Sequence, residues 1–432
     1  MFNYENVLIV GSGGREHALG WKISKSKKVK KIYHADGNGG TYENIPIFPT
    51  ETEKLAEFAR HNKCFTIVGP ETPLSLGIVD SFNSKELPIF GPSKNASLLE
   101  TSKKHSKNFM KSNFIPTAEF KTFTDSTKAI DHINKIGHDV VVKADGLASG
   151  KGVFVTNNKK DAIEAVELLL NKQIFGKSSE EIIIEKKITG DEVSIIALCD
   201  GRSFTILEPC KDHKRAFEND TGPNTGGMGS FSPVSDIKVE EIHQISKKVF
   251  QPTLDGMEKN GNPFNGFLYA GLMIENQTRK PYVLEFNVRM GDPECQPLMM
   301  RMESDLFEYM ESIENKSIDS MKPISWKEKY SVCVVMASKG YPGKYKTGHI
   351  IKGLDRVDKE GLMVFHAGTK LRSSNELVTN GGRVLGVTSL GNTLEEAIDK
   401  SYHNVEKIVW GNNQQQYRKD IAAKNQSQVK SV

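Results

Sequence analysis

The fold is decided by residues 140–156, VVVKADGLASGKGVFVT, in which two apolar runs enclose a glycine-rich turn. The runs at 140–144 and 151–156 predict a β-hairpin. The turn is not a P-loop, because it lacks G-x-x-x-x-G-K-[ST] and opens no helix. Lys143 lies among apolar neighbours, where an ammonium group is costly unless an anion pairs with it or its head snorkels to solvent. The pattern favours a mobile hairpin that closes over a triphosphate, with Lys143 as a cation for the phosphates.

The residues around this hairpin predict a small α+β unit over about 121–190. DAIEAVELLL at 161–170 has helical spacing, and EIIIEKKI at 181–188 predicts a strand. Two antiparallel strands follow, VSIIALCDG and SFTILEP. A helix near 238–259 then leads to two further strands, GFLYAGLMIE and PYVLEFNVRM.

A polar, glycine-rich segment lies between these strand pairs at 211–233, KDHKRAFENDTGPNTGGMGSFSP. It buries little apolar surface, and its glycines at 222, 226, 227 and 229 allow the backbone to approach a ligand closely. Asp212, His213, Lys214 and Arg215 supply directed donors and acceptors in front of the glycines. The order of residues favours a substrate loop, and a solvated surface loop of the same composition is the alternative.

The strand at 281–290 places polar and apolar side chains on opposite faces. Glu285, Asn287 and Arg289 alternate with apolar residues at 284, 286 and 288. Carboxylate and amide oxygens suit Mg²⁺, which usually keeps waters and phosphate oxygens as its other ligands. An arginine can hold a carboxylate by two parallel hydrogen bonds, which favours Arg289 as a group that binds a substrate carboxylate. An edge strand with a solvated polar face would show the same alternation.

The N-terminal part alternates short strands with helical segments, which predicts a parallel sheet with crossover helices. The expected strands are residues 7–10, 30–35, 64–69 and 87–91. In VLIVGSGGREHALG, Gly11, Gly13 and Gly14 lie between strand and helix, where backbone N–H groups favour a phosphate. A purely structural turn is one alternative. A dinucleotide site with Asp36 on the ribose is another, but Glu16 stands where G-x-G-x-x-G needs its third glycine.

The whole chain has the composition of a globular enzyme, with 432 residues of which 37% are hydrophobic. Its net charge of +4 comes from 58 basic and 54 acidic residues and is too small to favour a nucleic-acid partner. The five cysteines show no metal-ligand spacing, so buried thiols in a reducing compartment are expected. The first residues lack the features of a secretory signal, and no apolar run approaches the roughly 18 residues of a membrane span. We therefore expect a cytoplasmic protein without a membrane partner.

Both the 211–233 segment and PYVLEFNVRMGDPECQ at 281–296 resemble the phosphoribosylamine–glycine ligase family of ATP-grasp enzymes. The hairpin at 140–156 is similar to the flexible ATP-grasp loop, and YPGKYKTGHIIKGL and GGRVLGVTSLG are similar to the family's C-terminal domain. The resemblance covers nearly the whole chain. Two departures are Glu218-Asn219, where the family commonly has a more acidic, glycine-containing pair, and the more basic GYPGKYKTG.

The resemblance implies a multidomain α/β and α+β fold. We expect an N-terminal open parallel α/β domain at 1–104, an ATP-grasp core at 105–323 with a small mobile lid at about 121–190, and a small C-terminal α/β domain at 324–425. Residues 426–432 are expected to form a flexible tail.

The resemblance also implies the site residues. Those expected to bind ATP are Lys103, Lys143, Gly150, Lys151, Gly152, Glu185, Lys187, Ile188 and Glu192, with the backbone at 185–188 on adenine and Glu192 on ribose. Those expected to bind the other substrates are Gly11, Gly13, Gly14, Glu71, Asp212, Lys214, Asn224, Thr225, Gly226, Gly227, Arg289 and Asp292. Glu285 and Asn287 are the expected ligands of Mg²⁺ or Mn²⁺. Arg289, Asp212 and Lys151 are the expected catalytic residues, with Arg289 on the glycine carboxylate and Asp212 on an amine.

The implied reaction is ATP-dependent ligation of glycine to 5-phosphoribosylamine through glycyl phosphate, in purine (IMP) biosynthesis, by a monomeric enzyme. Another ATP-grasp carboxylate–amine ligase, or a carboxylase of the same pathway, would share the lid and the metal strand and differ in the 211–233 segment. A dinucleotide-binding oxidoreductase is favoured only by the first 36 residues. A non-catalytic nucleotide-binding regulator is disfavoured by the presence of Lys143, Glu285 and Asn287.

Overall fold

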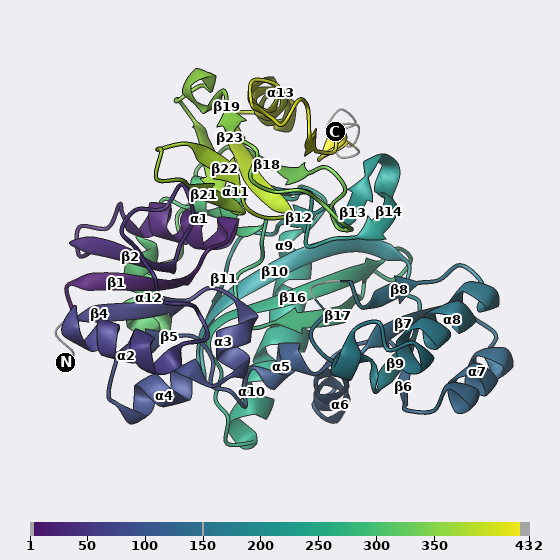
Figure 1. The fold of residues 1–432 in the computed structure, drawn as a ribbon. Helices are drawn as coiled ribbons and strands as arrows, with labels where there is room; N and C mark the ends of the chain where they lie inside the picture. The colour runs from purple at the N-terminus through teal and green to yellow at the C-terminus, as the bar shows by residue number, and fades with distance from the viewer. Residues whose placement is uncertain (1–3, 149–150, 424–432) are drawn as a thin grey trace.

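An open parallel sheet forms the N-terminal part of the molecule, at the left of Figure 1. The computed structural model describes residues 4–148 and 151–423. The elements of this part are β1 (Asn6–Gly11), α1 (Gly14–Ile23), β2 (Lys31–Asp36), β3 (Asn44–Ile45), α2 (Thr52–His61), β4 (Cys64–Val68), α3 (Glu71–Ser75), α4 (Ile78–Ser84) and β5 (Ile89–Phe90). The strand order is β3-β2-β1-β4-β5, and every neighbouring pair is parallel. The predicted parallel sheet is confirmed, and its central strands β1 and β4 are buried because crossover helices cover them.

The lid unit follows at the lower right of Figure 1 and has a hydrophobic core of its own. Two helices, α5 (Leu98–Thr101) and α6 (Lys103–Ser112), lead into it. Its elements are β6 (Phe120–Phe123), α7 (Ser126–Lys135), β7 (Val140–Ala144), β8 (Val153–Val155), α8 (Lys159–Val166) and β9 (Ile182–Lys186). The sheet order is β6-β9-β7-β8, and the predicted hairpin is the antiparallel pair β7–β8.

The helix predicted at 161–170 differs in its bounds. It begins at Lys159, because the Asn158 side chain caps it by accepting the Asp161 N–H. Its α-helical part ends at Val166, and a π-helical turn continues to Asn171.

A four-stranded antiparallel sheet forms the centre of the molecule, in the order β11-β10-β16-β17. Its strands are β10 (Gly190–Asp200), β11 (Phe204–Ile206), β16 (Asn265–Glu275) and β17 (Pro281–Asn287). The helix predicted near 238–259 consists of α9 (Val239–Ile245), a π-helical turn (Ser246–Phe250) and α10 (Gln251–Lys259). Two further helices, α11 (Cys295–Arg301) and α12 (Leu306–Glu314), lay outside the prediction.

The predicted strict alternation on β17 is wrong at one position. Gly271 of β16 is opposite Glu285, but the next residue, Leu272, is opposite Val283, so Leu284 is the extra residue of a bulge. Leu284 is only half-buried, and Val283 joins Phe286 in the core in its place.

The C-terminal sheet includes both ends of the polar 211–233 segment, which was not predicted to form strands. The sheet order is β12-β15-β18-β23-β20, with β25 also paired to β18. Its strands are β12 (Lys211–Asp212), β15 (Gly229–Ser232), β18 (Tyr330–Ser338), β20 (Leu362–His366), β23 (Arg383–Gly391) and β25 (Gln415–Gln416). The predicted helix near 393–409 is α13 (Leu394–Val405). The smaller pairs are β13 (Arg215–Phe217) with β14 (Thr221–Asn224), β19 (Ile351–Lys352) with β24 (Val409–Trp410), and β21 (Thr369–Leu371) with β22 (Leu377–Thr379).

All five cysteines are buried free thiols, as expected. Among the residues that the structure describes, no helix is both long and apolar enough to cross a bilayer. The predicted tail at 426–432 and the predicted ATP-binding residue Gly150 lie outside the described residues.

Candidate active site

The polar face of β17 gathers four cations around one carboxylate. Lys214 Nζ lies 3.9 Å from Glu285 Oε1. Burial alone raises the pKa of the Glu285 carboxyl, but the charges of Lys214, Lys143, Lys103 and Arg289 hold this pKa below its usual value. Glu285 is therefore a carboxylate at neutral pH.

Glu285 and Asn287 suit a hard cation such as Mg²⁺. Both present oxygen atoms on the same face of β17, and the Glu285 side chain is 34% exposed, which leaves room for further ligands. Asn287 Oδ1 accepts a hydrogen bond from Arg289 Nη2 at 3.1 Å, which fixes its orientation. Within residues 4–148 and 151–423, no group of three or more His, Cys, Asp or Glu side chains forms a competing all-protein metal site. A metal here would take its remaining ligands from water and phosphate.

Lys143 is buried rather than snorkelling, with its side chain 7% exposed. It forms an ion pair with Glu185, and its Nζ donates to the carbonyl oxygen of Leu284, the bulge residue, at 3.1 Å. Lys103 Nζ donates to the Gly146 carbonyl at 3.1 Å, in the turn of the lid hairpin. The predicted need of Lys143 for an anionic partner is met in this structure by Glu185.

Three further predicted ATP-binding residues, Lys187, Ile188 and Glu192, lie after β9, where the chain passes from the lid sheet to the central sheet. Lys187 Nζ donates to the Thr156 carbonyl at 3.2 Å and to Asn157 Oδ1 at 3.0 Å. Ile188 is half-buried directly after it. Glu192, on β10, accepts from Lys214 Nζ at 2.5 Å. Residues 187–189 connect β9 of the lid sheet to β10 of the central sheet.

The lid hairpin touches both the substrate segment and the C-terminal sheet domain. Lys151 is exposed, and its Nζ donates to the Pro342 carbonyl at 3.3 Å. Asn224 Nδ2 donates to the Val153 carbonyl at 3.2 Å. A Cβ on Gly152 would lie 2.8 Å from the Ala148 Cβ, so this turn requires a glycine. These contacts join the hairpin to both neighbouring segments.

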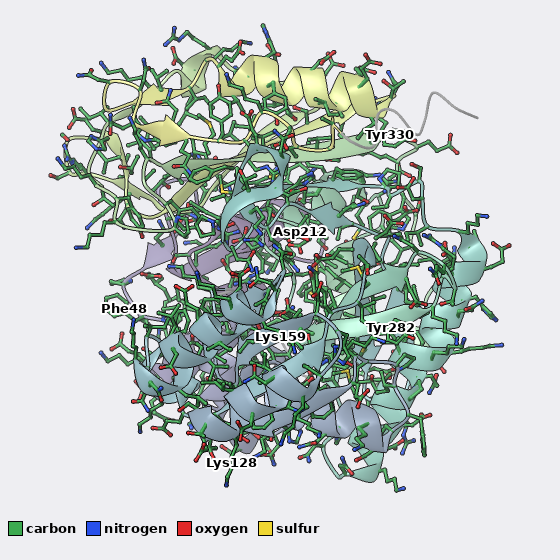
Figure 2. The ribbon with its side chains drawn as sticks, turned by 90° about the vertical axis from the view of Figure 1, so that its right-hand side faces the viewer. Phe48, Lys128, Lys159, Asp212, Tyr282 and Tyr330 are labelled. Atoms are coloured by element: carbon green, nitrogen blue, oxygen red, sulfur yellow. The ribbon has the colours of Figure 1, made fainter. Side chains whose placement is uncertain are left out.

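Asp212 lies in the middle of the molecule, between Lys159 of the lid unit and Tyr330 of the C-terminal sheet (Figure 2). Burial raises the pKa of its carboxyl, Lys214 lowers it, and the carboxylate of Glu294 raises it further. Glu294 itself is 4% exposed and accepts a hydrogen bond from Tyr269 Oη at 3.0 Å. This part of the site has an excess of carboxylates, which favours a cationic ammonium group as its ligand.

Arg289 lies at the end of β17 between two carboxylates. Its Nε is 3.2 Å from Glu71 Oε2, and its Nη2 is 2.7 Å from Glu100 Oε1. Glu71 is the first residue of α3, so this contact joins the N-terminal sheet to the central one. The predicted substrate residues Glu71 and Arg289 are therefore direct neighbours.

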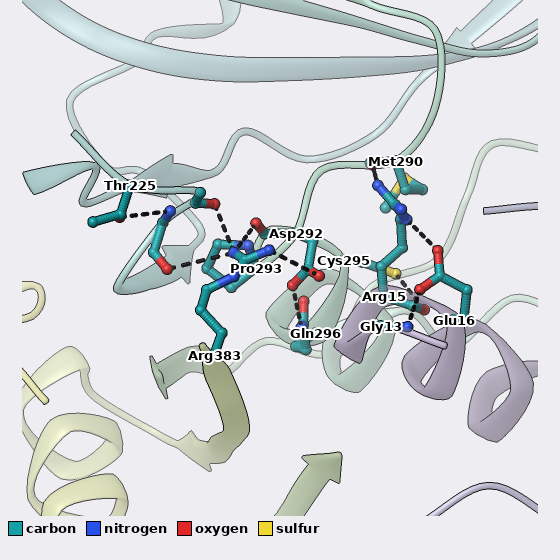
Figure 3. Close-up of polar contacts among 12 residues, drawn as sticks. Gly13, Arg15, Glu16, Thr225, Met290, Asp292, Pro293, Cys295, Gln296 and Arg383 are labelled. Carbon is teal, nitrogen blue, oxygen red and sulfur yellow. Dashed lines mark hydrogen bonds and ion pairs between the residues drawn. The ribbon is translucent and has the colours of Figure 1, made fainter. Parts of the chain in front are cut away.

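Arg383, on β23, holds Asp292 and the glycines of the substrate segment together (Figure 3). Its Nη2 lies 3.2 Å from Asp292 Oδ2, and its Nη1 donates to the Gly226 carbonyl at 2.6 Å. The segment is braced internally as well, since Thr225 Oγ1 donates to the Lys214 carbonyl and accepts the Gly227 N–H. Asp292 Oδ1 accepts from Gln296 Nε2 at 2.9 Å.

The N-terminal glycine turn is capped by Glu16 (Figure 3). Its carboxylate accepts the Gly13 N–H at 2.6 Å and forms an ion pair with Arg15 Nε at 2.7 Å. Gly11 has φ +123°, and a Cβ there would lie 2.8 Å from Glu16 Cγ. Gly14 packs against Gln296, so the turn meets the same cluster as Asp292. The need for a tight turn between strand and helix therefore explains Gly11. The buried Glu16 disfavours the alternative that this turn binds a dinucleotide.

Three family models match consecutive parts of the chain. They are the phosphoribosylglycinamide synthetase N domain at residues 5–100, its ATP-grasp (A) domain at 101–295 and its C domain at 331–424. The chain belongs to the phosphoribosylglycinamide synthetase family. The resemblance seen in the sequence is confirmed.

Members of this family are similar over almost the whole chain. The phosphoribosylamine–glycine ligase of Rhodopirellula baltica is 44% identical over 416 residues, which are 94% of this chain and 94% of that protein. The Escherichia coli K12 ligase is 45% identical over 411 residues, 94% of this chain and 95% of that protein. The crystal structure of the Thermotoga maritima ligase has a TM-score of 0.83 and 36% identity, and covers 96% of this chain and 100% of that one.

A solved structure of much lower sequence identity is informative about the fold only. Biotin carboxylase from Campylobacter jejuni in complex with β,γ-ATP has a TM-score of 0.72 at 14% identity, and covers 97% of this chain and 94% of that one. The predicted multidomain α/β architecture with an ATP-grasp core is thus confirmed.

Four charged residues near the predicted site were missed from the sequence. Glu100 forms an ion pair with Arg289 and Arg383 one with Asp292, while Glu294 raises the pKa of Asp212 and Arg15 lowers that of Asp292, but all four were assigned no role. Glu294 lies within the quoted motif PYVLEFNVRMGDPECQ, and Arg383 within GGRVLGVTSLG, so the motifs contained the signal for these two. Glu100 lies in an ordinary helical pattern, which contains no signal for a role in the site.

Proposed function

We propose that this protein catalyses the ATP-dependent formation of an amide bond between glycine and 5-phosphoribosylamine. The products are N1-(5-phosphoribosyl)glycinamide, ADP and phosphate, a step of purine biosynthesis. The glycine carboxylate attacks the γ-phosphate of ATP to give glycyl phosphate. The amine of phosphoribosylamine then displaces phosphate and loses a proton as the amide bond forms. No covalent enzyme intermediate is needed, so positioning and charge neutralisation supply the catalysis.

ATP lies, in this proposal, between the lid unit and the central sheet. Lys103 and Lys143 neutralise its phosphates, the Glu185–Ile188 backbone holds adenine, and Glu192 holds the ribose. The lid hairpin with Gly150, Lys151 and Gly152 closes over the triphosphate and excludes water from the acyl phosphate. Glu285 and Asn287 would hold Mg²⁺, which neutralises phosphate charge when bound.

Glycine and the amine substrate lie between β17 and the substrate segment. Arg289 holds the glycine carboxylate, and Asp212 with Glu294 holds its ammonium group, since the carboxylates there lack sufficient cations. Phosphoribosylamine lies where the Gly11–Gly14 turn, Asp292 and the glycines held by Arg383 meet.

The observation that carries the proposal is the meeting of three separate segments at Arg289 and Asp292. Glu71 of the N-terminal sheet, the end of β17, and Arg383 with the 211–233 segment contact one another there. The matched family and the curated ligases at 44–45% identity support the same reaction. We further propose that the enzyme is a cytoplasmic monomer, uses Mg²⁺ or Mn²⁺, and takes only small-molecule substrates.

The test is ADP release by the purified protein with Mg-ATP, glycine and freshly generated phosphoribosylamine, with each component omitted in turn. We expect ADP formation to require all three, with the ribosylated glycinamide detected by mass. ADP release without phosphoribosylamine would reassign the amine substrate. A folded, Mg²⁺-supplied sample without any ATP turnover would overturn the proposal.

A further inference from the structure

A buried chain of charges, Lys107–Glu185–Lys143, joins helix α6 to the two central strands of the lid sheet. Lys107 and Lys143 each form an ion pair with one oxygen of the Glu185 carboxylate. The side chains of Lys107, Glu185 and Lys143 are 3%, 3% and 7% exposed, so water screens these charges only weakly. Lys107 was not among the predicted site residues.

The geometry of the chain follows from the strand register. In the antiparallel β7–β9 ladder, Val141 is opposite Glu185, so Lys143 is the diagonal neighbour of Glu185 on the same face. Lys107 reaches the other carboxylate oxygen from α6, one helical turn after Lys103. Lys107 Nζ also donates to Thr117 Oγ1 at 2.7 Å, and Thr117 Oγ1 in turn donates to the Val283 carbonyl of β17 at 2.7 Å. Lys107 is therefore held in place on the side away from Lys143.

Glu185 has two cationic partners, and of these only Lys143 is also a predicted phosphate-binding residue. Lys143 also contacts the backbone of β17 next to Glu285, whereas Lys107 is tied to Thr117. If Lys143 turns towards a phosphate, a buried carboxylate with no other partner would lose its counter-charge, which is costly. Lys107 removes this cost because Glu185 keeps one ion pair. Burial lowers the pKa of Lys107 to about 8, with the charge of Glu185 acting against this shift, so Lys107 is an ammonium ion at pH 7.

We propose that Lys107 is a positioning residue for ATP: it neutralises Glu185 so that Lys143 is available to the nucleotide phosphates. The inference rests on the proposed function in taking Lys143 as a phosphate-binding cation. Without Lys107, Glu185 and Lys143 form a buried pair, and the carboxylate competes with the nucleotide for the ammonium group of Lys143. The defect of a Lys107 variant is therefore relieved by removing the charge of Glu185.

The experiment measures the binding of a non-hydrolysable ATP analogue with Mg²⁺ by calorimetry, in the full-length chain. We expect Lys107→Met to weaken binding about tenfold. In a Glu185→Gln background the same Lys107→Met change should alter the Kd by less than about threefold, because no carboxylate remains to compete for Lys143. In steady-state assays Lys107→Met should raise the KM for ATP and leave the KM for glycine unchanged.

Lys104→Met is the matched control, because Lys104 lies on the same helix and forms a more exposed pair with Glu181 at 2.9 Å. It should leave nucleotide affinity unchanged. Additive losses in the double variant, or unchanged binding by a folded Lys107→Met protein, would overturn the inference. If Lys107→Met does not fold, the comparison of Glu185→Gln with and without Lys107→Met decides: an about tenfold loss on removing Lys107 in that background overturns the inference. A wild-type protein that does not bind the analogue would instead count against the proposed function.

Discussion

Arg289 donates its Nη2 to Glu100 Oε1 at 2.7 Å, and the other oxygen of the same carboxylate accepts the Val288 N–H at 2.8 Å. Glu100 thus fixes both the backbone at the end of β17 and the guanidinium group that follows it. Burial raises the pKa of Glu100, while the charge of Arg289 opposes this shift. The direction of Arg289, and with it the place proposed for the glycine carboxylate, depends on a carboxylate in the short helix α5.

Arg289→Lys should separate substrate binding from folding. The lysine keeps a positive charge beside Glu71 and Glu100 but loses the forked geometry that holds a carboxylate. We expect the KM for glycine to rise at least about tenfold and the KM for ATP to stay within about twofold. Steady-state kinetics with each substrate varied will show this, and an unchanged KM for glycine would remove Arg289 from that role. Arg289→Ala is a poorer test, because it leaves two carboxylates unpaired at a cost of about 3–5 kcal/mol.

Arg418 should be the largest single electrostatic contributor to the position of the β13–β14 hairpin. Its side chain is 1% exposed, and it pairs with Asp220 at 2.9 Å and with Asp420 at 2.7 Å. Arg418→Met removes both ion pairs, but the Asp220 and Asp420 side chains are 48% and 20% exposed and can be solvated, so the free energy of unfolding should fall by about 1–3 kcal/mol. Tryptophan fluorescence in urea measures the change.

The control for Arg418 is Arg202→Met. Arg202 pairs with Glu258 at 2.8 Å, but these side chains are 82% and 46% exposed. Its loss should change the free energy of unfolding by less than about 1 kcal/mol. Equal effects of the two substitutions would show that burial does not determine how much the Arg418 contacts contribute to the free energy of unfolding.

Acid should weaken the contact between the N-terminal and C-terminal sheets. His17 Nδ1 accepts the His366 N–H at 2.9 Å, and burial lowers the pKa of His17 to about 3 and that of His366 to about 4. In the unfolded chain both titrate near about 6.5. The unfolded state therefore binds more protons below this value, and stability is complete above pH 6.5 and falls as the pH drops towards about 4.

The expected loss is up to about 1.4 kcal/mol per pH unit for each of the two histidines. Urea titrations between pH 7.5 and 4.5 measure it. His366→Asn removes one titrating ring and should reduce the slope of stability against pH. A slope that does not change would assign the acid sensitivity to other groups.

Removal of divalent metal should abolish product formation, and Glu285→Gln should weaken metal binding more than about tenfold. The amide keeps the shape of the side chain but loses the charge that Lys214, Lys143 and Lys103 stabilise. Electron paramagnetic resonance of Mn²⁺, with the ATP analogue present, gives metal affinity independently of turnover. Asp191→Asn, which alters an exposed carboxylate paired with Arg279, is the control and should bind Mn²⁺ normally. Normal Mn²⁺ binding by Glu285→Gln would place the metal elsewhere.

Short-range residue patterns correctly predicted the strands and turns that depend mainly on neighbouring residues. The glycine-bounded apolar runs of β1 and of the β7–β8 hairpin, and the period-two alternation of Glu285 and Asn287, follow from backbone geometry and burial of one face. The bulge at Leu284 did not follow, because one extra residue changes the register without changing composition.

Contacts between distant segments could not be predicted in this way. Glu100 meets Arg289, and Arg383 meets Asp292, only because separate sheets pack together at these points. The charged side chains involved look like surface residues in sequence, and burial is a property of the assembled fold. For the same reason no strand was predicted in the polar 211–233 segment, although β15 pairs with β18.

This pairing sets an order of events during synthesis. Gly229 and Ser230 meet Val334 and Cys333, which leave the ribosome far later than the lid unit and β17. By then the lid unit has its own strands and core, but residues 229–232 of the 211–233 segment still lack their partner strand β18. A nascent chain that stops before residue 330 should therefore form the lid unit, while its 211–233 segment would lack the strand β18 with which β15 pairs.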